Sequence, residues 1–251
     1  MRYLDRVSLA FPLGAAALAA ASGWPASAAI VALSVPAGSP PRACPRCDLA
    51  DPFSGRVAAR ARCRRCTVAL GPPPLLLAVP MAILAGTAAS LVHPFLVACA
   101  VCWLTICAIP LAAIDTAARR LPDVLTGTAF AGTAAFLAAA AALDDQWQDL
   151  GRACGGALAV ACLFTLLALA RPGSAGLGDA KLGLSVGALA AWLGWAVLAV
   201  AMFGGFLLAG LYGMWLIASR RASLRSTLAF GPFLLAGCLG AVLLASAAGP
   251  R

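Results

Sequence analysis

Residues 181–218 read KLGLSVGALAAWLGWAVLAVAMFGGFLLAGLYGMWLIA, and after Lys181 this stretch contains no charged side chain. A membrane-spanning helix needs about 20 apolar residues, so the stretch is too long for one crossing and has to fold back. Its best breaking point is Trp192-Leu193-Gly194-Trp195, because tryptophan favours the membrane interface and glycine permits a turn. The stretch therefore predicts two membrane helices joined by a tight turn.

Apolar runs fill most of the remaining chain. The composition is 63% hydrophobic and 11% charged, with a mean hydropathy of +0.95, which leaves too little polar surface to cover a water-soluble globule. We expect an all-α polytopic membrane protein with about eight transmembrane helices in the lipid bilayer. The expected runs lie at about 8–34, 74–92, 95–114, 124–143, 153–170, 181–218 and 227–248.

Three regions are expected along the chain. They are a first transmembrane helix over 1–35, a small Cys-rich polar loop over 36–72, and a transmembrane domain over 73–251. The first helix follows Arg2 and Arg6 and could also be a cleaved signal peptide. We favour an uncleaved helix, because the next segment carries the Cys and Arg pattern of a cytosolic domain.

The basic residues predict the orientation. Alternating crossings place the 36–72, 115–123, 171–181 and 219–226 loops on one side, and these loops hold 14 of the 18 Lys and Arg residues. By the positive-inside rule that side is the cytoplasm. The net charge of +9 does not indicate nucleic-acid binding, because no aromatic-interleaved basic face accompanies it.

Two Cys-x-x-Cys pairs predict a metal site in the first cytoplasmic loop. Cys44 and Cys47 are followed, after fifteen residues, by Cys63 and Cys66. Four thiolates at this spacing can surround Zn²⁺ tetrahedrally, and because protein ligands fill all four positions the zinc would be structural. Two disulfides are the main alternative, and a redox pair is a weaker one.

Three aspartates lie at the predicted cytoplasmic helix ends. Asp123 follows Leu121-Pro122 and precedes an apolar run, which favours a helix N-cap. Asp115 directly continues an apolar run, so its carboxylate is expected at or just below the membrane surface. Asp179 follows a glycine-rich turn, and although it could be a cap as well, its neighbouring glycines allow another chain or helix to approach closely.

Asp115 and Asp179 are the candidate catalytic pair. If they meet, like-charge repulsion and partial desolvation would leave them sharing one proton near neutral pH. The ionised carboxylate can then accept a proton from water that attacks a peptide carbonyl, while the protonated one polarises that carbonyl. A His-based triad is excluded by topology, since His93, the chain's one histidine, is expected on the opposite side.

The sequence resembles the prepilin leader peptidases, membrane aspartic proteases of the Gly-x-Gly-Asp type. The resemblance covers about 40–248 and rests on Ala113-Ile114-Asp115, Leu121-Pro122-Asp123, Gly176-Leu177-Gly178-Asp179-Ala180-Lys181-Leu182 and Phe230-Gly231-Pro232-Phe233-Leu234. It implies an eight-span enzyme that removes the leader peptide from type IV prepilin-like or type II secretion pseudopilin precursors at the cytoplasmic face. It assigns catalysis to Asp115 and Asp179, the active-site loop to Gly176, Gly178 and Lys181, and zinc-type knuckles to the four loop cysteines.

One stretch departs from the family. Many members carry a Gly-Ser-Phe-Leu-Asn-like stretch leading to an Arg and also methylate the new N-terminus, whereas residues 29–36 here contain neither Asn nor a matching Arg. S-adenosylmethionine is therefore expected only if that second activity is retained. The alternative functions are a proton-coupled transporter that uses intramembrane Asp residues, and a zinc-dependent assembly factor without catalysis.

Overall fold

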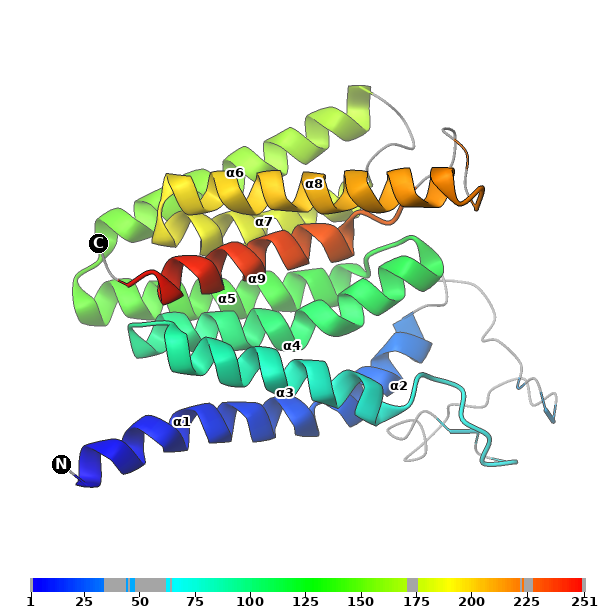
Figure 1. The fold of residues 1–251 in the computed structure, drawn as a ribbon, viewed down its shortest axis with the longest axis horizontal. Helices are drawn as coiled ribbons and strands as arrows, with labels where there is room; N and C mark the ends of the chain where they lie inside the picture. The colour runs from blue at the N-terminus through cyan, green and yellow to red at the C-terminus, as the bar shows by residue number, and fades with distance from the viewer. Residues whose placement is uncertain are drawn as a thin grey trace.

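The computed structural model describes residues 2–33, 44, 46–47, 62–63, 65–170, 176–221, 223 and 228–249. Within these residues the protein is all-α, as predicted, and an isolated bridge between Arg62 and Ala69 is its only extended pairing (Figure 1). The helices are α1 (Arg2–Ala21), α2 (Gly23–Leu33), α3 (Pro74–Leu91), α4 (Phe95–Ala118), α5 (Asp123–Asp144), α6 (Trp147–Ala170), α7 (Leu177–Leu193), α8 (Trp195–Ala218) and α9 (Gly231–Ala247).

The apolar segments make this a multi-pass membrane protein. Six described segments are long and apolar enough to cross a bilayer, namely Ala10–Leu33, Pro74–Leu91, Phe95–Ala118, Asp123–Asp144, Trp147–Ala170 and Trp195–Ala218. Helices α7 and α9 have 17 residues each. At about 1.5 Å per residue they are roughly 25 Å long, slightly less than the ~30 Å hydrocarbon core. Of these two, α9 is a shorter apolar helix that adds to the six longer segments. A crossing by α7, which would complete the eight expected from the sequence, remains a prediction.

The first apolar run is divided into two helices at Ser22. Backbone hydrogen bonds continue on both sides of the break, from Ser22 N to Leu18 O at 3.0 Å and from Ala26 N to Ser22 O at 2.9 Å. Pro25 has no N–H to donate to the carbonyl of Ala21, which is the last residue of α1. The sequence predicted one continuous helix here, and the proline explains the difference.

The predicted fold-back between Trp192 and Trp195 is confirmed. Helix α7 ends at Leu193, α8 begins at Trp195, and Gly194 between them has φ +138° and ψ 156°. Residues with a Cβ rarely adopt this conformation, so glycine makes the one-residue turn possible. The turn returns the chain across the bundle and leaves the first turn of α7 at the opposite end.

Helix α7 lies at the centre of the bundle and packs against α4, α5, α6, α8 and α9. Small residues bring the helices close together: Gly156 of α6 faces Gly187 of α7, and a Cβ on either glycine would overlap the other's carbonyl oxygen. Membrane helices use such glycine contacts to gain packing area. Because neighbouring helices contact α7 along its length, they also fix the position of its first turn.

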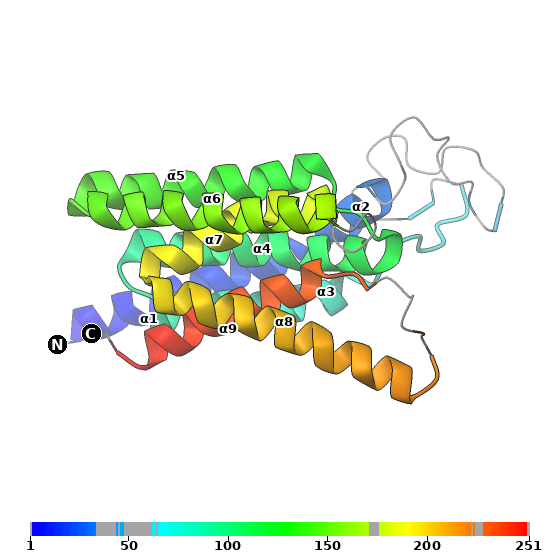
Figure 2. The same cartoon turned by 90° about the horizontal axis from the view of Figure 1, so that it is seen from above.

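The helix ends form two groups. Both termini and the α3–α4, α5–α6 and α7–α8 turns lie at one end of the bundle (Figures 1 and 2). The end of α2, the α4–α5 connection and the starts of α7 and α9 lie at the other end, where the arginine-rich loops were predicted. Most of the 36–72 loop and residues 171–175 lie outside the described residues, and the three-region division remains a prediction.

Candidate active site

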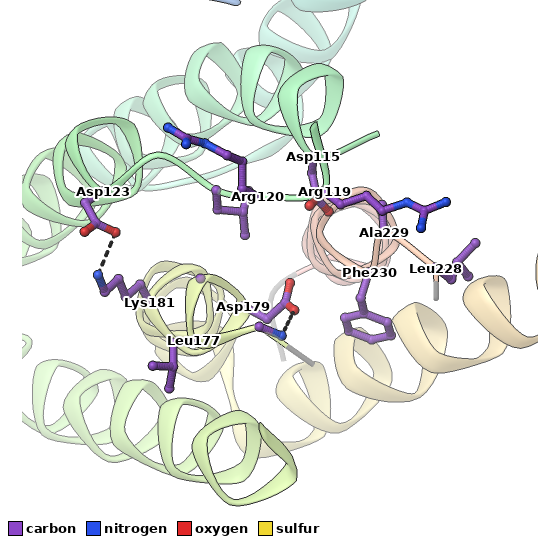
Figure 3. Close-up of a pocket in the computed structure, with 13 residues that line it drawn as sticks. Asp115, Arg119, Arg120, Asp123, Leu177, Asp179, Lys181, Leu228, Ala229 and Phe230 are labelled. Carbon is purple, nitrogen blue, oxygen red and sulfur yellow. Dashed lines mark hydrogen bonds and ion pairs between the residues drawn. The ribbon is translucent and has the colours of Figure 1, made fainter. Parts of the chain in front are cut away.

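A pocket of about 490 Å³ opens where the end of α4 meets the starts of α7 and α9 (Figure 3). Its lining includes Gly176, Gly178 and six ionisable residues: Asp115, Arg119, Arg120, Asp123, Asp179 and Lys181. The structure thus brings the two predicted catalytic aspartates together with all three residues assigned to the active-site loop. Of these, Gly178 and Lys181 belong to the first turns of α7, and Gly176 directly precedes the helix.

Asp115 occupies the last turn of α4 and is 6% exposed. Its Oδ2 accepts a hydrogen bond of 3.0 Å from the backbone N–H of Gly231, the first residue of α9. The four N-terminal amides of a helix have no intrahelical acceptor, so a carboxylate is a natural partner for one of them. A contact between residues 116 positions apart therefore fixes the carboxyl group of Asp115.

Asp179 is the third residue of α7 and is 7% exposed. Its Oδ2 accepts a hydrogen bond of 3.0 Å from the backbone N–H of Gly176, and its own N–H donates to the carbonyl of Gly176 at 2.9 Å. This is one half of a capping box, and glycine has no side chain for the other half. The N-cap of α7 is therefore Gly176 and not Asp179, as the sequence allowed; Asp179 instead accepts the N–H of that cap from within the first turn and also lines the pocket.

The two carboxylates face the same space. Figure 3 shows both directed into the pocket, from α4 and from α7, and they repel each other electrostatically. Within the described residues, the two ion pairs involve Asp149 and Asp123 rather than this pair. Two buried carboxylates without a salt bridge can hold one proton between them, which is the state required for one to act as acid and the other as base.

Gly178 allows α7 to approach the α4–α5 connection. A Cβ added to Gly178 would lie 2.9 Å from the Cβ of Leu121, closer than carbon atoms approach in proteins. At Gly176 the nearest atom to an added Cβ would be 3.7 Å away, an ordinary contact. The two glycines of the motif therefore have different roles, and only Gly178 is required for close packing.

The structure corrects the prediction for Asp123. The N-cap of α5 is Pro122. Asp123 is the first residue of the helix, and no side-chain hydrogen bond caps this helix end. Its Oδ1 instead forms an ion pair of 2.6 Å with Nζ of Lys181, whose side chain is half-exposed (Figure 3). The pair connects α5 to α7 at the rim of the pocket, and its exposure limits its contribution to stability.

Two residues at the start of α9 were not assigned a role from sequence. Phe230 lines the pocket and packs its ring 5.3 Å from that of Phe164 and 5.0 Å from that of Phe206. Gly231 holds Asp115 through its backbone. The Phe-Gly-Pro sequence was visible, but nothing in it indicated a contact with a residue more than a hundred positions earlier.

The four loop cysteines form a group that can hold a metal such as zinc. The sulfurs of Cys44, Cys47, Cys63 and Cys66 all lie within 4.8 Å of one another, and all four are free thiols. The Cys44–Cys66 and Cys47–Cys63 sulfur distances are 3.5 and 3.6 Å. A tetrahedron with Zn–S bonds of about 2.3 Å requires sulfurs about 3.8 Å apart, so the donor set fits this metal.

Backbone amides prepare one of these thiols for a metal. Hydrogen bonds from the backbone N–H groups of Cys66 and Arg65 lower the pKa of the Cys63 thiol from 9.0 to about 6. Metal ligation by cysteine requires the thiolate, which these amides stabilise at neutral pH. The knuckle itself is closed by a 2.9 Å hydrogen bond from Cys63 N to Val68 O.

Comparison with known families adds one finding. Residues 98–214 match the model described as the type IV leader peptidase family, and this match supports a prepilin peptidase family assignment. The matched range includes both Asp115 and Asp179 but neither the cysteine group nor α9. No curated protein and no solved structure matched the chain.

Proposed function

We propose, from the premise that the chain belongs to the type IV leader peptidase family, that it is a membrane aspartic endopeptidase. The proposed substrates are type IV prepilin-like or type II secretion pseudopilin precursors, from which it removes the leader peptide. The observation that carries the proposal is the pocket in which Asp115 and Asp179, both nearly buried and from separate motifs, face each other.

The chemistry follows from the shared proton. The ionised aspartate accepts a proton from a water molecule as that water attacks the scissile carbonyl, and the protonated aspartate polarises the carbonyl oxygen. The departing amine is then protonated as the tetrahedral intermediate collapses. Burial of both side chains keeps bulk water from screening the pair, and the pocket volume of about 490 Å³ leaves room for part of an extended peptide.

The pocket is proposed to face the cytoplasm of a bacterial plasma membrane. Arg119, Arg120 and Lys181 line the pocket, and Arg220 and Arg221 follow α8, whose end lies at the same end of the bundle. This is the charge that the positive-inside rule requires of a cytoplasmic surface. The opposite end carries Asp144, Asp145 and Asp149, together with Arg152 and the N-terminal Arg2 and Arg6. A leader peptide that remains in the cytoplasm would reach the pocket from this side.

Zinc is the proposed occupant of the Cys44, Cys47, Cys63 and Cys66 group, with a structural role. With all four positions filled by cysteine, the metal would have no open coordination site for chemistry. It would hold together a loop that is too small to bury a core of its own. N-methylation is not part of the proposal, because residues 29–36 lack the Asn and Arg of the bifunctional members.

Single Asp-to-Asn variants test the proposal. Asp115→Asn and Asp179→Asn are each expected to abolish leader cleavage of a prepilin mixed with the purified protein, because Asn can neither share nor transfer the proton. Asp123→Asn is the matched control, since it lies in the same pocket but is paired with Lys181 and should retain cleavage. Cleavage that survives both of the first two substitutions would disprove the catalytic dyad.

The transporter alternative predicts different results from the same variants. A protein that relays protons through Asp115 and Asp179 would show proton flux in liposomes and no cleavage of any precursor. The family match favours the peptidase, because it covers the segments that supply both aspartates.

A further inference from the structure

The contact between Gly231 and Asp115 extends the active site to α9. Asp179 receives its hydrogen bond from Gly176, three residues away on the same chain segment, so this bond forms whenever α7 forms. Asp115 receives its bond from a residue 116 positions away. The orientation of Asp115 therefore depends on where α9 begins.

The first turn of α9 offers Asp115 a single amide. Gly231 follows the N-cap Phe230, and the next residue, Pro232, has no N–H. The amides of Phe233 and Leu234 donate to the carbonyl of Phe230, at 3.0 and 3.1 Å. Among the described first-turn residues, the N–H of Gly231 is thus the one that remains for the carboxylate.

Residue 231 also has to lack a side chain. A Cβ there would lie 2.8 Å from Oδ2 and 3.4 Å from Cγ of Asp115. An added methyl group would consequently push the carboxyl group away from the amide. Since Gly231 is helical, alanine fits its backbone, and the contact with Asp115 is the reason for glycine.

Packing holds the start of α9 in place. Gly237 sits against the backbone of Ala201 and Gly205 in α8, and Leu234 is fully buried. Phe230, which directly precedes α9, packs its ring against those of Phe164 and Phe206. The amide of Gly231 is therefore presented to Asp115 by a rigid element.

We propose that Gly231 is a positioning residue for the proteolytic reaction: its N–H holds Oδ2 of Asp115, and its missing side chain leaves space for that contact. Oδ1 does not take part in that hydrogen bond and is the oxygen left for sharing the proton with Asp179. This inference rests on the proposed function for its effect on cleavage, while the contact itself can be tested without activity.

The test compares Gly231→Ala with Gly240→Ala. Both substitutions add one methyl group to α9, but the space around Gly240 is open, with no atom within 4 Å of an added Cβ. In the purified full-length protein, Gly231→Ala is expected to lower kcat for prepilin cleavage roughly 10- to 150-fold, the equivalent of one hydrogen bond to a charged group, and Gly240→Ala to leave kcat unchanged. An unchanged kcat in Gly231→Ala would overturn the proposal.

The pH profile separates positioning from a general structural effect. The amide of Gly231 stabilises the ionised form of Asp115, so its loss should move the acid limb of kcat/KM to higher pH. A lower rate with an unmoved acid limb would show that the glycine acts only through packing.

Thermal unfolding tests the contact independently of cleavage. Gly231→Ala should unfold at a lower temperature than Gly240→Ala, and this difference should disappear when Asp115 is replaced by alanine, which removes the carboxyl group that the added Cβ meets. If Gly231→Ala does not fold, recovery of folding in the Asp115→Ala background supports the contact equally. If the difference in unfolding temperature is the same with and without Asp115, the contact is refuted. If the difference disappears in the Asp115→Ala background but the unaltered protein cleaves no prepilin, only the proposed function is refuted.

Discussion

The two glycines before Asp179 are predicted to differ in their tolerance of alanine. A Cβ on Gly178 would lie 2.9 Å from Cβ and 3.4 Å from Cδ1 of Leu121. Carbon atoms in contact are about 3.5–4.0 Å apart, so α7 and the α4–α5 connection would have to separate by at least about 0.6 Å. Overpacking of this kind costs about 1–3 kcal/mol. Asp179 is the next residue and would move with the turn.

Gly178→Ala is therefore expected to reduce both stability and cleavage. A displacement of about 1 Å in a catalytic group can lower the rate on the order of 10²-fold, so the smaller shift here predicts a loss in kcat of roughly 10- to 100-fold. Gly176→Ala is the matched control. Its added Cβ would meet nothing nearer than 3.7 Å, and its φ of −89° and ψ of 151° are accessible to alanine.

Leader cleavage and thermal unfolding of the purified variants provide the assay. Leu121→Gly removes the atom that the new Cβ meets, so combining it with Gly178→Ala should recover part of the lost activity relative to Leu121→Gly alone. Equal losses in Gly176→Ala and Gly178→Ala would refute the reasoning, because they would show that the motif needs glycine for a reason other than the contact with Leu121.

Three further predictions concern the metal group and the far end of α7. Purified protein should contain about one zinc per chain, and Cys44→Ser should lose it while Cys154→Ser retains it; little zinc together with an absence of free thiols would favour disulfides. In metal-free protein, alkylation of Cys63 should be half-maximal near pH 6, because its lowered pKa makes the reactive thiolate the main form above that pH, and a midpoint near 9.0 would contradict the hydrogen bonds from the backbone amides of Cys66 and Arg65. Arg152 donates to the carbonyls of Ala191 and Trp192 at the end of α7 and also pairs with Asp149. Arg152→Met should consequently destabilise the protein by about 1.5–3 kcal/mol in thermal unfolding, and Asp149→Asn, which leaves the carbonyl contacts intact, by less than about 1 kcal/mol; equal effects would contradict this role.

Local sequence patterns predicted the helices well, because each helix break has a local cause. Gly194 between two tryptophans marked the fold-back of α7 and α8, and the structure has its turn at that residue. The break at Ser22 was missed, although Pro25 was visible, since proline often lies in the first turn of a membrane helix without dividing it. The helix ends that adjoin the arginine-rich loops lie at one end of the bundle, as expected when successive helices cross in alternating directions.

The site was only partly predictable, because its contacts join residues far apart in sequence. Acidic residues are rare in this chain, so Asp115 and Asp179 could be chosen from the sequence as candidate catalytic residues, and the structure places both in one pocket. The sequence around Asp123 fits an N-cap, but its actual partner, Lys181, is 58 residues away. The role of the Gly231 N–H could not be predicted from sequence, because every residue except proline has a backbone N–H and the residue type does not show which one binds a carboxylate.

The position of Asp115 explains why the pocket needs α9. The C-terminal end of a helix carries partial negative charge, so a carboxylate in the last turn of α4 is electrostatically unfavourable, typically by about 0.3–1 kcal/mol. Asp179 has the opposite situation, because it lies in the first turn of its own helix. The amide of Gly231 gives Asp115 the helix N-terminus that α4 does not provide. Each aspartate then has one oxygen held by a backbone N–H at the start of a helix, Asp115 by α9 and Asp179 by α7. Helix α9 lies beyond residue 214, where the family match ends. The site therefore requires this later part of the chain to pack against Asp115.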